Sequence, residues 1–201
     1  MTFISTLAPE DAVGDVQEMY RRQQAAWGYV PNYAMAFSHR PEVLARWGRL
    51  LAEIRRPMSD RRFELVTFAA ALELRNSACS LAHGKQLAAF FSYEEIAAMA
   101  AGEYGPSLTD AEREIVKFAR ICARDATAVT SRDVERLREH GITDAEVFDI
   151  VATAAGRAFF TKLLDGLGVE LDATFSSLNP ALRESVATAT RSTAGVHAPT
   201  D

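Results

Sequence analysis

The residues best suited to chemistry in this 201-residue sequence are Cys79 and His83. A spacing of four places both side chains on one face of a helix, so the imidazole can accept the thiol proton. Cys79 also closely follows a break in the helical pattern at Asn76, and the positive end of a helix dipole favours a thiolate there. The spacing therefore predicts a reactive thiol.

Glu64 is the third candidate, because its neighbours along the sequence are almost all apolar and a buried carboxylate needs a partner. We expect residues 60–74 and 78–91 to form a helical hairpin. Across that hairpin, Glu64 and His83 differ in axial height by roughly 7 Å at a rise of about 1.5 Å per residue. Two side chains, or one water between them, can span this height, so we expect Glu64 to orient His83 and His83 to activate Cys79.

A glutamate followed by a Cys-x-x-Cys pair and a histidine is typical of the carboxymuconolactone decarboxylase and alkylhydroperoxidase D (AhpD)-like superfamily. This sequence resembles that pattern, and the residues at its four positions are Glu64, Asn76, Cys79 and His83. The stretches at 28–32 and 39–43 are similar to the peroxidase-related branch. The resemblance implies an all-α, AhpD-like helical bundle with a central apolar hairpin, a homo-oligomer, and a peroxidase-like oxidoreductase activity.

One departure from the family pattern changes the expected chemistry. In redox members, one thiolate reduces the peroxide and the second resolves the resulting sulfenic acid as a disulfide. Asn76 stands at the place of the first cysteine and cannot do this. Peroxide reduction would therefore use the single thiol of Cys79, with an external thiol reductant, because Cys122 lies in an apolar helical stretch.

Two other functions stay open. In a decarboxylase-like lyase acting on a small carboxylated lactone, Glu64 and His83 would handle protons and Cys79 would be part of the pocket wall. Alternatively, the chain is a non-catalytic oligomeric protein with a decayed redox site, and Cys79 is a small buried hydrophobe. Asn76 is a candidate helix cap or, as a lesser alternative, a substrate contact.

Composition and charge argue against several other classes. The net charge of −5 lacks the basic footprint that nucleic acids need, and no apolar run approaches the roughly 20 residues of a membrane span. Two cysteines indicate no disulfide framework, so we expect a cytoplasmic protein. Cys79 and His83 alone make no metal site, and without a Gly-rich phosphate loop we expect no cofactor. We expect Trp27, Trp47 and Phe160 in the core or a subunit interface.

The elements that must position these residues are helices throughout. Residues 60–74 leave almost no polar face, so we expect this helix to be central. Capping boxes predict helix starts at Ser92, Thr109 and Thr143. We predict one domain over residues 1–184, followed by a flexible tail over 185–201, where the Thr/Ala/Ser-rich sequence loses its periodicity.

Overall fold

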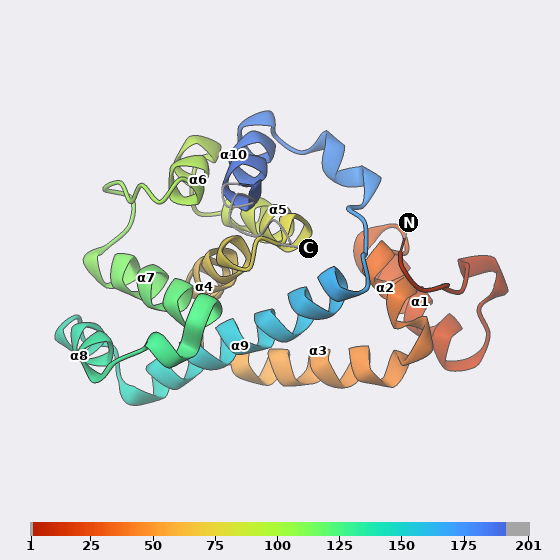
Figure 1. Ribbon diagram of the computed structural model, residues 1–201, viewed down its shortest axis with the longest axis horizontal. Coiled ribbons are helices and arrows are strands. Elements are labelled where there is room, and N and C mark those ends of the chain that lie inside the picture. The colour runs from red at the N-terminus through yellow and green to blue at the C-terminus, as the bar shows by residue number, and fades with distance from the viewer. Residues whose placement is uncertain (1, 192–201) are drawn as a thin grey trace, which may run out of the picture.

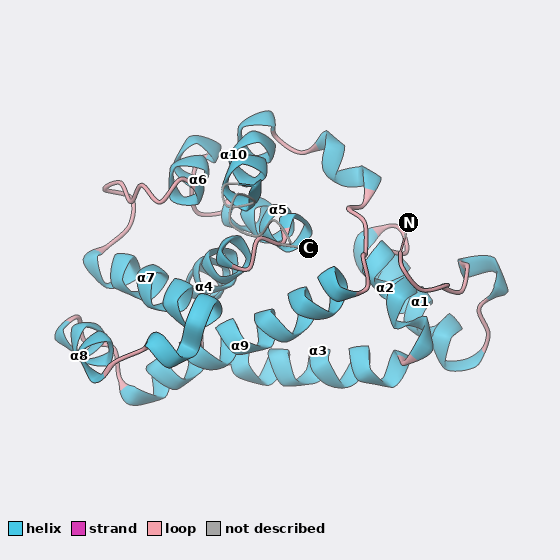
Figure 2. Ribbon diagram, viewed as in Figure 1, coloured by secondary structure: helices cyan, strands magenta, loops and turns pink. Residues whose placement is uncertain are grey.

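The computed structural model describes residues 2–191, and within them the chain forms α-helices and short 3₁₀ turns with no strand (Figure 2). This confirms the all-α prediction. The α-helices are α1 (Gly14–Trp27), α2 (Asn32–Ala36), α3 (Pro41–Arg55), α4 (Asp60–Glu73), α5 (Ser77–Leu87), α6 (Tyr93–Ala100), α7 (Asp110–Asp125), α8 (Ser131–Glu139), α9 (Asp144–Gly166) and α10 (Pro180–Arg191). None of these helices is long and apolar enough to cross a membrane.

Helix α4 lies at the centre of the fold, as its apolar sequence predicts. Every residue from 63 to 72 is buried, and the helix packs against α5, α7 and α9 (Figure 1). Ser59 caps its first turn by accepting a hydrogen bond from the backbone N–H of Arg62. Because α4 is surrounded by other helices, a polar side chain on it must find its partner inside the protein.

A tight turn joins α4 to α5 and makes the predicted hairpin. Arg75 adopts the left-handed conformation (φ 57°), and the N–H of Asn76 reaches back to the carbonyl of Ala71 at 3.1 Å. Asn76 then caps α5, since its side-chain oxygen accepts the N–H of Cys79 at 2.8 Å. The turn therefore fixes where Cys79 lies relative to α4.

Two long helices, α3 and α9, pack side by side along one edge of the molecule (Figure 1). α9 also contacts α4 and α7, so it lies between the central helix and α3. Helices α1 and α2 cover one end of α3. This arrangement brings side chains from α3 and α9 towards the start of α5, although they are distant in sequence.

The expected helix starts are confirmed, because Ser92, Thr109 and Thr143 each form both hydrogen bonds of a capping box. The expected start of the tail at residue 185 differs from the structure. Residues 185–191 continue α10, whose Leu182 and Val186 are fully buried against α5 and α6. Leu182 packs where Gly84 has no side chain, a contact between residues distant in sequence. The rest of the predicted tail, 192–201, lies outside the described residues.

Candidate active site

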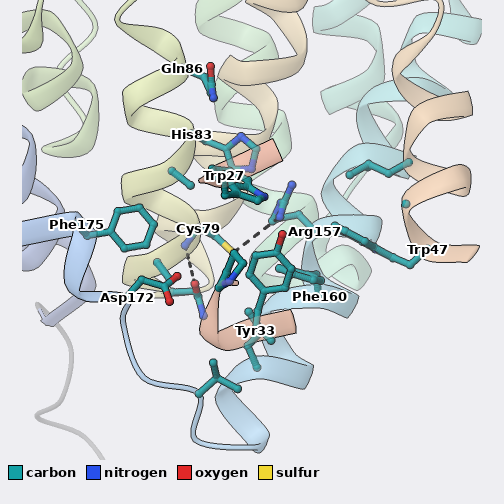
Figure 3. A pocket seen from close by; sticks show the side chains of 18 of the residues that line it. Trp27, Tyr33, Trp47, Cys79, His83, Gln86, Arg157, Phe160, Asp172 and Phe175 are labelled. Atoms are coloured by element: carbon teal, nitrogen blue, oxygen red, sulfur yellow. Dashed lines mark hydrogen bonds between the residues drawn. The ribbon is translucent and has the colours of Figure 1, made fainter. Parts of the chain in front are cut away.

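A pocket of about 480 Å³ lies between α3, α4, α5 and α9. The four residues singled out from the sequence all line it: Glu64, Asn76, Cys79 and His83. Figure 3 shows Cys79 and His83 on the same side of α5, as their spacing of four requires. The structure therefore brings the sequence-derived candidates to one cavity.

Cys79 is buried in the first turn of α5, with 5 % of its surface exposed. Burial raises the pKa of its thiol above the ordinary value, and the nearby positive charge of Arg157 opposes this only in part. The sequence-based expectation that the helix dipole would favour a thiolate is therefore outweighed by desolvation. The resting form of Cys79 is the neutral thiol.

Glu64 and His83 form the pair that the hairpin predicts. Nδ1 of His83 donates to Oε2 of Glu64 at 2.6 Å, and Glu64 is 5 % exposed. With the proton on Nδ1, the other ring nitrogen, Nε2, is left as a proton acceptor. Burial and Arg157 lower the pKa of His83, although Glu64 pulls it upward, so the imidazole is neutral at neutral pH.

The polar contact of the Cys79 sulfur is with Arg157, and no hydrogen bond joins it to His83 within residues 2–191. Nη1 of Arg157 donates to Sγ at 3.8 Å, as the dashed line in Figure 3 shows. Arg157 comes from α9 and is only 4 % exposed. Sequence reasoning missed Arg157. It is nevertheless a charged residue in an otherwise apolar stretch of α9, which is the same feature that identified Glu64 on α4.

Aromatic side chains form one wall of the pocket. Trp47 from α3 stacks on Phe160 from α9, with ring centroids 4.3 Å apart, and Tyr33 meets Phe160 edge-on at 5.3 Å. Trp27 also lines the cavity. Phe160 lies in the core, as expected, and Trp47 packs against the same cluster, whereas Trp27 at the end of α1 is 44 % exposed. The packing of α3 on α9 also turns the rings of Trp47 and Phe160 towards the site (Figure 3).

Asn76 is buried, and both ends of its side-chain amide have partners. Its oxygen caps α5, and Nδ2 donates to Oδ1 of Asp165 at 2.6 Å. The structure thus places Asn76 as a helix cap. Its possible role in binding substrate stays a prediction.

Cys122, the other cysteine, lies on α7 and is not among the residues that line the pocket. Both cysteines are free thiols. Burial raises the pKa of Cys122 to about 11, which leaves little thiolate at neutral pH. Residues 2–191 also contain no cluster of three His, Cys, Asp or Glu side chains arranged to hold a metal ion.

No protein-family model and no curated protein matches the sequence. Solved structures do resemble it. An uncharacterized peroxidase-related protein from Ralstonia eutropha JMP134, described as an alkylhydroperoxidase AhpD core, superposes with a TM-score of 0.73 at 20 % identity, covering 87 % of this chain and 94 % of its own. A peroxidase-related protein from Silicibacter sp. TM1040 gives the same TM-score and identity over 88 % and 94 %.

The debrominase Bmp8, as its C82A variant in complex with 2,3,4-tribromopyrrole, also has a TM-score of 0.73, at 14 % identity over 94 % of this chain and 98 % of its own. Identities this low establish the fold alone. They confirm that the helices of this chain have the AhpD-like arrangement.

Proposed function

We propose that this chain, which has the AhpD-like fold, is a thiol-dependent oxidoreductase that reduces a small organic hydroperoxide with the single thiol of Cys79. His83 acts as the general base and Glu64 orients it. The observation that carries the proposal is the placement in one pocket of a free thiol and a neutral imidazole whose Nδ1 is anchored by a carboxylate. Their joint access to a cavity supports catalysis over a non-catalytic role.

The chemistry starts from the protonated thiol. His83 takes the proton of Cys79, and Arg157 stabilises the thiolate as it forms. The sulfur attacks one peroxide oxygen, so that an S–O bond forms and the O–O bond breaks. The departing alkoxide takes the proton from His83 and leaves as an alcohol. Cys79 is oxidised to a sulfenic acid, and the hydroperoxide is reduced.

An external thiol completes the cycle, because Asn76 and Cys122 supply no resolving sulfur. The external thiol attacks the sulfenic sulfur, which forms a mixed disulfide and releases water. A second external thiol then attacks that disulfide, which restores Cys79 and yields the oxidised external disulfide.

Assembly into a homo-oligomer, which the family resemblance implies, is part of this proposal and is measurable by light scattering.

A lyase that acts on a small carboxylated lactone is the second candidate. The absence of a Cys79–His83 hydrogen bond among the described residues favours it, because the Glu64–His83 pair could then move protons without the thiol. In this alternative Cys79 only shapes the pocket. The two functions therefore differ in whether Cys79 is needed.

Trapping the oxidised thiol tests the proposal. The reduced protein is treated with dilute cumene hydroperoxide and dimedone, and the modified cysteine is identified by mass spectrometry. We expect the adduct on Cys79 in the wild type and in Cys122→Ser, and dithiothreitol-dependent consumption of peroxide that Cys79→Ser lowers by at least about 100-fold.

An unmodified Cys79, or peroxide consumption that Cys79→Ser leaves intact, would overturn the peroxidase function. Decarboxylation of carboxylated lactones that persists in Cys79→Ser would then establish the lyase. Because one neighbour is a debrominase, a brominated pyrrole is a useful additional electrophile in the same assay.

A further inference from the structure

Arg157 is a buried cation for which no carboxylate forms an ion pair within residues 2–191. Other partly buried arginines have such partners: Arg61 pairs with Glu112 and Arg120 with Glu73. Arg157 is more deeply buried than either, at 4 % exposed. Because buried charges are almost always paired, the structure leaves room for one negative charge beside Arg157.

The contacts that Arg157 does make are weak ones. Nη1 reaches the neutral thiol of Cys79 at 3.8 Å, and Nε is buried with no hydrogen-bond partner. The guanidinium carbon lies 5.7 Å from the ring centroids of both Trp47 and Phe160. A ring face attracts a cation, but by roughly 0.5–2 kcal/mol, far less than the cost of burying an unpaired charge.

We propose that Arg157 binds the carboxylate of an aromatic acid in this pocket and thereby positions the hydroperoxide group that this acid carries beside the sulfur of Cys79. The inference builds on the reactive thiol proposed above and names the class of substrate. Arg157 would act here as a substrate-binding residue, and its planar fork suits the two oxygens of a carboxylate.

The surroundings favour a single negative charge on a flat, apolar body. Glu64, Glu170 and Asp172 also line the pocket, and their carboxylates disfavour an anion of higher charge such as a phosphate. The stacked rings of Trp47 and Phe160 provide a flat surface next to the guanidinium. An aromatic ring can pack on this wall while its carboxylate meets Arg157.

Because Arg157 contacts Cys79, a substrate bound by Arg157 is also held next to the reactive sulfur. A carboxylate bound to the guanidinium would lie close to Sγ of Cys79, because Nη1 of Arg157 is 3.8 Å from that sulfur. The thiol is protonated before reaction, so it presents no negative charge that would repel the acid. The substrate is thus held before His83 removes the proton.

Tryptophan fluorescence provides a direct test, because the sequence contains two tryptophans and both line the pocket. The wild-type protein is titrated with benzoate and with benzamide, which has the same shape without the charge. A hydrogen-bonded charge contributes about 1.5–3 kcal/mol, so we expect a Kd for benzoate at least about tenfold below that for benzamide. Equal affinities in the wild type, or no saturable signal with benzoate, would overturn the proposal.

Variants locate the effect. Arg157→Gln should bring the ratio of the two dissociation constants close to one, whereas Arg157→Lys, which keeps the charge, should retain part of the preference. Arg55→Gln is the matched control, because Arg55 also lines the pocket but already pairs with Asp60 at 2.7 Å. A preference for benzoate that survives in Arg157→Gln would contradict the assignment. If that variant does not fold, the wild-type ratio and Arg157→Lys decide.

The test is separable from that of the proposed function. Cys79→Ser lacks the reactive thiol but keeps Arg157, and we expect it to bind benzoate in preference to benzamide as the wild type does. If Cys79 proves inert to peroxide while this preference holds, the oxidoreductase function fails and the anion site stands. If Cys79 is oxidised but benzoate shows no preference, only the anion site is wrong.

Discussion

Nδ1 of His83 lies 2.6 Å from Oε2 of Glu64, which joins α5 to the central helix α4 through a hydrogen bond between two side chains 19 residues apart. The bond fixes the orientation of the imidazole and directs its second nitrogen away from the carboxylate. Because Glu64 is buried on a helix surrounded by other helices, this bond also satisfies a carboxylate that is largely shielded from water.

Replacing Glu64 by glutamine should slow the oxidation of Cys79 without unfolding the protein. The amide oxygen can still accept from His83, but the charge that stabilises the protonated imidazole is lost, at about 1.5–3 kcal/mol. We expect the rate of Cys79 oxidation by cumene hydroperoxide to fall roughly 10- to 100-fold. Stopped-flow kinetics measure this.

Glu73→Gln is the matched control, because Glu73 lies on the same helix, pairs with Arg120 and Arg124, and does not line the pocket. The oxidation rate in Glu73→Gln should equal that of the wild type. An unchanged rate in Glu64→Gln would remove Glu64 from the site.

The pH dependence of Cys79 oxidation should report the protonation of His83. His83 accepts a proton only when neutral, and its pKa is lowered by burial and by Arg157. The rate should therefore hold as pH falls to the ordinary histidine value of about 6.5 and decline only below it. A rate profile between pH 4 and 8, in buffers that keep the protein folded, measures the midpoint.

Two variants should move this midpoint in opposite directions. Arg157 lowers the pKa of His83, so Arg157→Gln should raise the midpoint, whereas Glu64 raises that pKa, so Glu64→Gln should lower it. Shifts of the same sign in both variants would show that the titrating group is not His83.

The reactivity of Cys79 towards iodoacetamide should follow the balance between burial and the charge of Arg157. Burial raises the pKa of the thiol, so alkylation in the native protein should be slow at pH 8 and rise with pH beyond the ordinary thiol range. Arg157→Gln removes the cation that favours the thiolate and should shift this profile to still higher pH. The measurement is made in Cys122→Ser protein by mass spectrometry.

Arg55→Gln is the control for this profile, because Arg55 contributes to the pKa of His83 but not to that of Cys79. Its alkylation profile should match that of the parent protein. Faster alkylation in Arg157→Gln than in the parent would contradict the assigned role of the cation.

Asn76 should matter more to stability than an ordinary helix cap. Replacing Ser92, the cap of α6, by alanine removes one capping bond and should cost about 1 kcal/mol. Asn76→Ala removes the cap of α5 and also leaves the carboxylate of Asp165 without its amide donor. We expect a loss of about 2–3 kcal/mol in the free energy of unfolding, measured by urea titration. Equal losses in the two variants would show that the Asp165 bond contributes nothing.

The sequence by itself determined the local geometry of this protein. The spacing of Cys79 and His83, the cap at Asn76 and the apolar run of α4 are short-range features, and helical periodicity converts them directly into positions on a surface. The hairpin between α4 and α5 connects its two helices within a few residues, so the helical rise placed Glu64 and His83 within reach of each other, and the structure shows a direct bond.

Tertiary structure alone decided what surrounds the thiol. Arg157 lies 78 residues from Cys79 in sequence, and only the packing of α9 on α4 brings them together. The packing of α3 on α9 made Trp47 and Phe160 a pocket wall, and α10 packs its Leu182 where Gly84 has no side chain. Desolvation likewise depends on every element packed around a group, so it cannot be read from the neighbouring residues in sequence. The sequence therefore predicted a favoured thiolate at Cys79, whereas burial in the folded protein raises the pKa of the thiol and favours its neutral form.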